Sequence, residues 1–161
     1  MTAVLPIARA DPAATAWRNH LAALAAATAA IGLLFLADAL DMARIWRDST
    51  TFNHCFLVGP IILWLVWQRL SELRQLAPRA WAPGLVLVTA GACAWLLGEA
   101  GNVALLRHFA LVLMVQGAVI ACLGKAVARG LAFPLFYAFF LVPFGEELVG
   151  PLQTLTAKMS M

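Results

Sequence analysis

Residues 131–153 read LAFPLFYAFFLVPFGEELVGPLQ, an apolar run that Pro134 and Pro143 interrupt and that Glu146 and Glu147 follow. Proline removes a backbone donor, and a carboxylate in lipid is costly unless neighbouring protein or water satisfies it. A simple membrane anchor has no use for either feature. Pro143 also disfavours helical geometry at the residue before it. We therefore predict that this segment is bent or broken, and that the rest of the chain forms a bundle around it.

The composition places the chain in a membrane. Of its 161 residues, 63% are apolar and 12% are charged, whereas soluble domains contain about 25% charged residues. Uncharged runs long enough to approach or cross a hydrocarbon layer of about 30 Å recur along the chain. These properties predict an all-α, polytopic transmembrane helix bundle in the lipid bilayer. No basic stripe interleaved with aromatic residues indicates a nucleic-acid surface, so nucleic acid is not expected as a partner.

Two parts are predicted, a cytoplasmic N-terminal tail at residues 1–18 and a transmembrane helical domain at residues 19–161. About five membrane segments are expected, the fifth being short and broken by proline: residues 21–37, 50–68, 83–97, 103–124 and 131–145. Residues 38–51 are expected to form a charged loop. The first segment has a competing interpretation as a signal peptide, because Ala37-Asp38-Ala39 resembles a cleavage site. The further spans that follow it favour a retained helix.

Lysine and arginine are distributed unequally between the two sides of these segments. With the N-terminus inside, seven basic residues face the cytoplasm: Arg9, Arg18, Arg69, Arg74, Arg79, Lys125 and Arg129. Four remain on the outer side: Arg44, Arg47, Arg107 and Lys158. Because cytoplasmic loops carry the excess of Lys and Arg, we predict that the N-terminus is cytoplasmic.

That topology gathers on the outer side the polar residues that are costly in lipid. They are Asp38, Asp41, Asp48, His54, Glu99, Arg107, His108, Glu146 and Glu147. Such a gathering indicates a site or a water-filled cavity. Ordinary interfacial residues, with Arg107 snorkelling to the water, would give the same pattern. We select His54 and Glu146 as candidates that border a shared substrate recess, with side chains within about 10 Å of each other.

The residues by themselves show no complete catalytic constellation. Cys55 directly follows His54, but helical neighbours point about 100° apart, so a thiol–imidazole pair is not expected. Cys93 and Cys122 are expected near opposite ends of their helices, too far apart for a disulfide. No C-x-x-C or paired-histidine spacing indicates a metal site, and no cofactor is expected.

Five short motifs follow one another along the chain and together match the pattern of a known family. The matching segments are TFNHCFLV (51–58), LWLVW (63–67), WLLG (95–98), LAFPL (131–135) and VPFGE…PLQ (142–153). The first two resemble the family pattern F-S-H-G-F-L-V…W-L-x-W, and the last two are similar to its FPL…PFGE…PLQ signature. The resemblance covers about Phe52 to Ala157. It is closest to the type A exosortases of bacteria that export exopolysaccharide.

The resemblance implies a membrane-embedded cysteine peptidase, a transpeptidase, that processes proteins with a PEP-CTERM tail at the bacterial inner membrane. Its protein partners would be the C-terminal tails of exported proteins. The family's nucleophile lies in an E-A-C-S-G-type motif with Arg and His partners further on, and the sequence contains no such motif. We therefore predict no catalytic residue in this chain and interpret it as the N-terminal scaffold of an exosortase.

Two departures and three alternatives accompany this interpretation. Asn53 and Cys55 stand where the family has Ser and Gly, and Arg107-His108 stands where Gln is common. These differences affect the surroundings of His54. The competing interpretations are a non-enzymatic partner subunit, a decayed remnant, and a small transporter built on the broken fifth segment.

Overall fold

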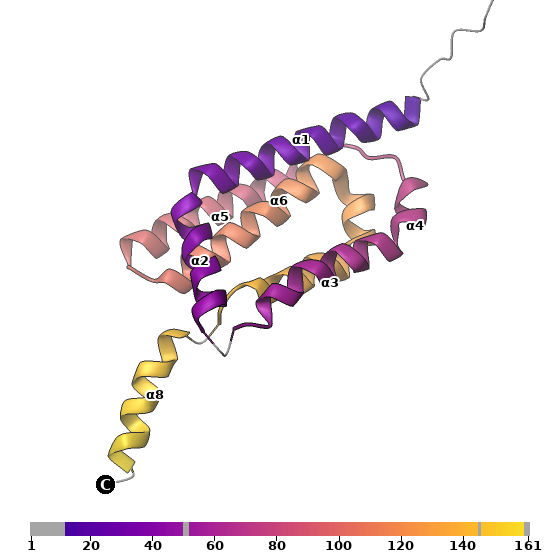
Figure 1. The fold of residues 1–161 in the computed structure, drawn as a ribbon. Coiled ribbons are helices and arrows are strands. Elements are labelled where there is room, and N and C mark those ends of the chain that lie inside the picture. Colours follow the sequence, from indigo (N-terminus) through magenta and orange to yellow (C-terminus); the bar gives the residue numbers. More distant parts are fainter. Residues whose placement is uncertain (1–11, 50–51, 145, 160–161) are drawn as a thin grey trace, which may run out of the picture.

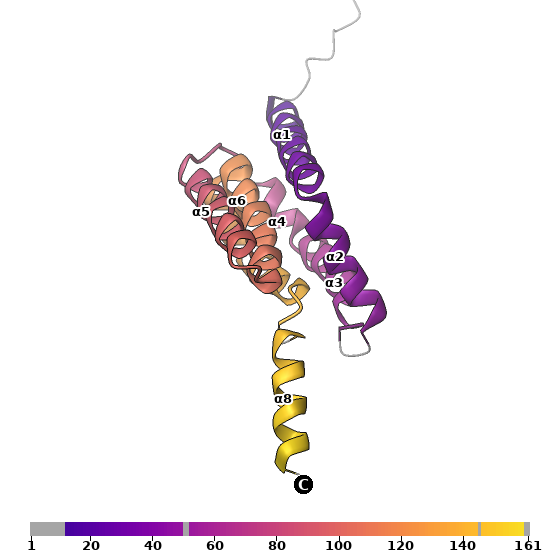
Figure 2. The same ribbon diagram turned by 90° about the vertical axis from the view of Figure 1, so that its left-hand side faces the viewer.

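The computed structural model describes residues 12–49, 52–144 and 146–159, and these residues form helices and turns without a strand (Figure 1). The predicted all-α class is confirmed. The helices, in chain order, are α1 (Pro12–Leu34), α2 (Leu36–Asp48), α3 (Cys55–Gln68), α4 (Leu70–Arg74), α5 (Pro83–Ala100), α6 (Ala104–Gly130), α7 (Ala132–Tyr137), the 3-10 helix η1 (Ala138–Leu141) and α8 (Glu146–Met159). In both overall views α8 extends away from the other helices (Figure 1; Figure 2).

Helix length separates full spans from shorter apolar segments. By length and composition α5 and α6 can each cross a membrane, and α1 with α2 makes a third span if that pair, bent by 82°, counts as one. Helix α3 and the α7–η1 pair (Ala132–Leu141) are apolar but shorter. In the second predicted segment, residues 50–68, the helix α3 begins at Cys55 and has 14 residues. A straight span needs roughly 20 residues, so α3 is shorter than a full span.

Two boundaries predicted from the sequence are wrong. Residues 38–48 are not a charged loop but most of α2, because Met42 and Trp46 are spaced by one helical turn and both pack against the core. Residues 12–18, which were predicted to belong to an irregular tail, are helical, because α1 begins at Pro12, a residue suited to the first helical turn. Residues 1–11 of the predicted tail lie outside the described residues. Whether the tail is cytoplasmic stays a prediction.

Helices α5 and α6 form an antiparallel hairpin that three glycines bring into close contact. The glycines recur every seven residues on α5, and each meets a residue of α6 that also recurs every seven. The pairs are Gly84 with Ala121, Gly91 with Met114, and Gly98 with Arg107. A Cβ added at Gly91 would lie 2.6 Å from Cγ of Met114, closer than atoms pack. The small residues thus let the two backbones approach, as they do in membrane helix pairs.

The remaining helices pack on this hairpin around two apolar clusters. Helix α1 lies along α6, and α2 bends from its end across the same side of the hairpin (Figure 1; Figure 2). The first cluster consists of Ile31, Met42, Leu111, Met114 and Ala118. The second consists of Leu73, Leu123, Val127 and Leu131. Helices α3 and α7 with η1 form a second pair, which contacts α6 through α7 and η1.

The proline-containing stretch is broken, as the sequence predicted. It is an α-helix to Tyr137, a 3-10 helix to Leu141, and extended backbone at Val142 (φ −76°, ψ 126°). Side chains from three other helices donate hydrogen bonds to its carbonyl oxygens. The donors and acceptors are Gln116 Nε2 to Leu135 (3.0 Å), Cys55 Sγ to Phe140 (3.4 Å) and Trp46 Nε1 to Leu141 (2.9 Å). The bundle therefore supplies the partners that a broken helix needs in lipid.

A second break lies in α6 at Gly124, which adopts φ 85° and ψ 173°. Only glycine takes this conformation readily, and a Cβ here would collide with the carbonyl oxygen of Arg79. The three carbonyls before the break accept hydrogen bonds from outside the helix. The donors are Trp81 N to Ala121 (2.9 Å), His20 Nδ1 to Cys122 (2.6 Å) and Arg79 N to Leu123 (3.3 Å). The kink thus ties α6 to α1 and to the segment before α5.

Charge divides the bundle into two ends. The basic end contains the start of α1, the α3–α4 corner and the end of α6. Its charged residues, among those that the structure describes, are Arg18, Arg69, Arg74, Arg79, Lys125, Arg129 and one acid, Glu72. The acidic end contains α2, the α5–α6 turn and the start of α3, with Asp38, Asp41, Asp48, Glu99, Arg44, Arg47 and Arg107. Of the polar residues predicted to share one side, those that the structure describes gather at the acidic end: Asp38, Asp41, Asp48, His54, Glu99, Arg107 and His108. The side chains of Glu146 and Glu147 lie outside the described part.

The charge division leads to a prediction about orientation. With the basic end in the cytoplasm, alkaline phosphatase fused after Asp48, Gly101 or Lys158 should be active in a bacterial host. Fusions after Arg74 and Arg129 should be inactive, since that enzyme folds only outside the cytoplasm. Activity is compared at equal fusion abundance on an immunoblot. The reverse pattern would overturn the cytoplasmic placement of the N-terminus.

Candidate functional site

A buried carboxylate connects three helices at the acidic end. Asp38, on α2, is 8% exposed. Its Oδ2 accepts a hydrogen bond of 2.7 Å from Nε1 of Trp95 on α5, and its Oδ1 lies 3.3 Å from Nε of Arg107 on α6. Burying an ion is costly unless it is paired. Asp38 has a hydrogen-bond donor at Oδ2 and a cation beside Oδ1, although the Arg107 Nε contact lacks hydrogen-bond geometry. The bend after α1 is what brings this carboxylate to the hairpin.

Arg107 bridges Asp38 and a more exposed acid. Its Nη1 donates to Oε2 of Glu99 at 2.6 Å, and the Glu99 side chain is 54% exposed against 21% for Arg107. Charge-assisted bonds of this kind are short and strong. Gly98 makes room for the arginine, because a Cβ there would lie 2.9 Å from Cγ of Arg107. Arg107 therefore does not snorkel alone to the water but joins two acids of different exposure.

His108 lies beside this network with an unsatisfied nitrogen. It is 1% exposed, and its Nε2 is 3.3 Å from Oδ2 of Asp41 without hydrogen-bond geometry. The contact becomes an ion pair only when the imidazole is protonated. Asp38, Asp41, Glu99, Arg107 and His108 thus form one polar cluster, which we call the acidic-end cluster. It joins α2, α5 and α6.

The candidate His54 lies at the same end and contacts its neighbour. His54 precedes α3 and is exposed, and its Nε2 is 3.8 Å from Sγ of Cys55. We expected the side chains of these adjacent residues to point apart. That expectation is wrong, because the imidazole is long enough for its Nε2 to reach the sulfur of the next residue. The sulfur is nevertheless buried, with Cys55 1% exposed, and it donates to the carbonyl of Phe140. A substrate carbonyl could not reach it.

Asn53 and Glu146 complete the residues singled out from the sequence. In the amide orientation that satisfies both groups, Asn53 donates to the carbonyl oxygens of Trp46 (2.8 Å) and Ser49 (3.2 Å), which closes the turn between α2 and α3. Glu146 is the first residue of α8, and its side chain lies outside the described part of the structure. The recess shared by His54 and Glu146 therefore stays a prediction.

The cysteines and acids suggest neither a disulfide nor a metal centre. Cys55, Cys93 and Cys122 are free thiols. Across residues 12–49, 52–144 and 146–159, no group of three or more His, Cys, Asp or Glu side chains is arranged to hold a metal ion.

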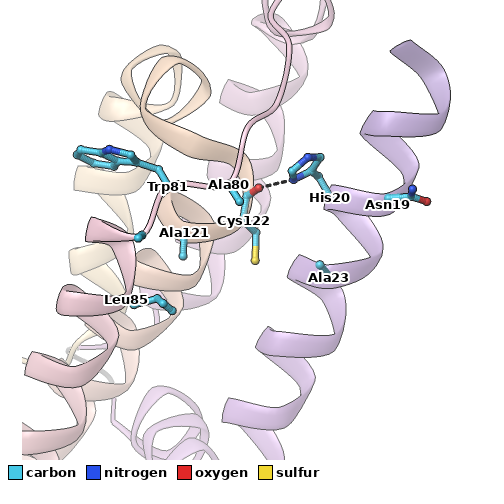
Figure 3. A pocket seen from close by; sticks show the side chains of 9 residues that line it. Asn19, His20, Ala23, Ala80, Trp81, Leu85, Ala121 and Cys122 are labelled. Atoms are coloured by element: carbon cyan, nitrogen blue, oxygen red, sulfur yellow. Dashed lines mark hydrogen bonds between the residues drawn. The ribbon is translucent and has the colours of Figure 1, made fainter. Parts of the chain in front are cut away.

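Besides a smaller cavity of about 350 Å³ whose lining includes Arg79 and Lys125, two larger cavities lie at the basic end, and none of the three was predicted from the sequence. One, of about 580 Å³, lies between α1 and the start of α5, where His20 points across to the Cys122 carbonyl (Figure 3). The other, of about 720 Å³, lies between α1, α4 and the end of α6, with Arg18 and Arg74 among its lining residues. Their lining residues are far apart in the chain, so no local motif marks either cavity.

A family model identifies the larger part of the chain. The model of the transmembrane exosortase family matches residues 46–161. The chain belongs to the transmembrane exosortase family. This confirms the resemblance seen in the sequence. No curated protein and no solved structure matches the chain.

The family match covers only part of the acidic-end cluster. It includes His54, Glu99, Arg107 and His108, and it begins after Asp38 and Asp41. In the Asp38–Arg107 pair, Asp38 therefore lies in a part of the chain that the family model does not cover, whereas Arg107 lies in the matched region.

Proposed function

We propose that this chain forms the membrane scaffold of an exosortase-type cysteine peptidase or transpeptidase that processes exported proteins with a PEP-CTERM tail. The reaction would take place at the bacterial inner membrane and would accompany exopolysaccharide export. Family membership across residues 46–161 supports the membrane part of this proposal. The scaffold's role would be to hold a substrate tail in place while a nucleophile elsewhere attacks it.

The observation that carries the proposal is the graded exposure of the acidic-end cluster. Asp38 is buried and fixes Arg107, while Glu99 on the other side of Arg107 remains half-exposed. A peptide that enters a membrane must have its N–H and C=O groups satisfied. Glu99 offers an acceptor, and His54 at the same end is also exposed. These groups would form one wall of the path for a substrate tail.

The chain's own thiols do not fit the nucleophile of such an enzyme. A thiol nucleophile must be accessible and activated as a thiolate by a neighbouring base. Cys55 has an imidazole nearby but is buried and hydrogen-bonded to a backbone carbonyl. Cys93 is exposed on α5, away from the acidic-end cluster. We therefore assign the chain a positioning role rather than a chemical one.

The first test is processing by the chain alone. Expressed in a host that lacks an exosortase, the 161-residue chain should leave a PEP-CTERM-tailed reporter at full length on an immunoblot. A complete exosortase in the same host is the positive control. If processing survives replacement of all three cysteines by alanine, the chain would be a peptidase that does not use a cysteine nucleophile. Processing that only Cys55→Ala abolishes would instead make the His54–Cys55 pair catalytic.

A chimera tests the scaffold role directly. Residues 12–161, which keep Asp38 together with Arg107 and Glu99, replace the corresponding N-terminal region of a complete exosortase that retains its own nucleophile, and the reporter should still be processed. Adding Glu99→Gln should reduce processing by about tenfold, since a charged acceptor is lost. The matched change Glu72→Gln, at the basic end, should have no effect. A chimera that inserts and folds but processes nothing would overturn the proposal.

A further inference from the structure

The cavity of about 720 Å³ at the basic end has the size of a small-molecule site. It lies between the first half of α1, the α3–α4 corner and the end of α6. Its deep wall is apolar and consists of Leu73, Leu123, Val127 and Leu131, all of which are buried. In a membrane protein, an apolar cavity that the side chains leave open is a place for hydrocarbon.

The rim of the same cavity is cationic. Arg18 of α1 and Arg74 of α4 both line it, and both are exposed. Among the side chains that the structure describes, the acid nearest in sequence to Arg74 is Glu72, which pairs instead with Arg69 at 3.7 Å. Neither Arg18 nor Arg74 has an ion-pair partner in that part of the chain. Within the described residues, two guanidinium groups therefore stand over an apolar wall without a paired acid.

The backbones that carry the two arginines are held together. Trp17, next to Arg18, donates from its indole Nε1 to the carbonyl of Leu76 at 3.1 Å. This bond joins α1 to the turn that follows α4, so the rim does not depend on the flexible arginine side chains for its shape. A preorganised rim lowers the entropy that a ligand must lose on binding.

From this arrangement we propose that the cavity binds an anionic phospholipid. The phosphate of the head group pairs with Arg18 and Arg74, and an acyl chain lies against the accessible apolar lining residues Leu21, Val66 and Leu70. Guanidinium groups match phosphate oxygens in charge and in bidentate geometry. Basic pockets between membrane helices select anionic head groups in the same way. The lipid would fill the space between α1 and α4 and hold these helices to α6.

The neighbouring cavity at the same end differs from the Arg18–Arg74 cavity in the charge of its lining residues. The cavity of about 580 Å³ is lined by Asn19, His20, Trp81 and small apolar residues, with no arginine or lysine. It has the volume for an acyl chain but lacks a cationic rim. A lipid there would be held without preference for head-group charge. The smaller cavity of about 350 Å³ has Arg79 and Lys125 in its lining but only about half the volume of the Arg18–Arg74 cavity, so selection for an anionic lipid is expected chiefly at the Arg18–Arg74 cavity.

The test is lipid retention by the purified full-length chain. The chain is extracted from vesicles of equimolar phosphatidylglycerol and phosphatidylcholine, and its lipid adducts are quantified by native mass spectrometry. Wild-type chain should retain phosphatidylglycerol over phosphatidylcholine, and the pair Arg18→Gln with Arg74→Gln should lower that preference by about tenfold. The control pair Arg79→Gln with Arg129→Gln removes the same charge from the same end, and it should keep the preference.

Two further measurements distinguish binding of a lipid from binding of a free phosphate compound, and loss of binding from loss of folding. Glycerol phosphate or inorganic phosphate, added at the same concentration, should not displace the lipid, because neither fills the apolar wall. Both arginine pairs should unfold at the wild-type temperature in zwitterionic detergent without lipid. Equal loss of preference in the two pairs, displacement by free phosphate, or equal retention of both lipids by wild-type chain would each overturn the proposal.

Discussion

Replacing Arg107 with methionine is expected to lower the free energy of unfolding by about 3 kcal/mol, because it leaves Asp38 as a buried charge without its cation. Asp38 would keep only the bond from Trp95. Methionine preserves the length and much of the packing of the arginine stem beside Gly98, so the loss reports the charge. The free energy is measured from reversible unfolding of the purified chain in mixed micelles, by titration with a denaturing detergent.

A double-mutant cycle separates the ion pair from packing. In an Asp38→Asn background, where no buried charge remains, Arg107→Met should cost only about 1 kcal/mol. The control Arg47→Met removes the arginine of an exposed ion pair with Asp48, which should contribute less than about 1 kcal/mol. An effect of Arg107→Met equal to that of the control, or unchanged by Asp38→Asn, would contradict the role given to the buried pair.

Gly84→Val is expected to destabilise the chain by about 3 kcal/mol, the upper end of what overpacking costs. A Cβ at this position would collide with the backbone of Ala121, which cannot move aside as a flexible side chain could. Valine would therefore force α5 away from α6 along the contact that also contains Gly91 and Gly98. Thermal unfolding in detergent, followed by size-exclusion chromatography, measures the loss.

The matched control for the hairpin is Gly32→Val in α1. A Cβ at Gly32 has nothing within 4 Å, so valine there changes helix propensity without a collision. It should alter stability by less than about 1 kcal/mol. If Gly84→Val and Gly32→Val had equal effects, the close approach of α5 and α6 would not be a source of stability.

The sequence was most informative where a residue type is tolerated only in one setting. Prolines and carboxylates after an apolar run require a break with partners, and the structure shows the break between Tyr137 and Val142. The clustering of Asp38, Glu99 and Arg107 at one end followed from topology alone. In each case the physical cost of the residue in lipid limits where it can lie.

Patterns that depend on side-chain reach or on distant segments were missed. Charged residues made residues 38–48 read as a loop, although Met42 and Trp46 carried the helical spacing. The seven-residue spacing of Gly84, Gly91 and Gly98 was visible in the sequence but indicates a contact only once a partner helix is known. The contact between His54 and Cys55 depends on one rotamer, which spacing does not specify.

The two breaks, at Gly124 and after Tyr137, have a consequence for how the chain is made. Six donors from other parts of the chain bond to carbonyls beside these breaks: His20, Trp46, Cys55, Arg79, Trp81 and Gln116. Each donor precedes its acceptor in the chain. Because a growing chain leaves the ribosome from its N-terminus, every partner is already synthesised when the carbonyl that needs it emerges. Insertion can therefore proceed in order, without an unsatisfied backbone group waiting in lipid for a later segment.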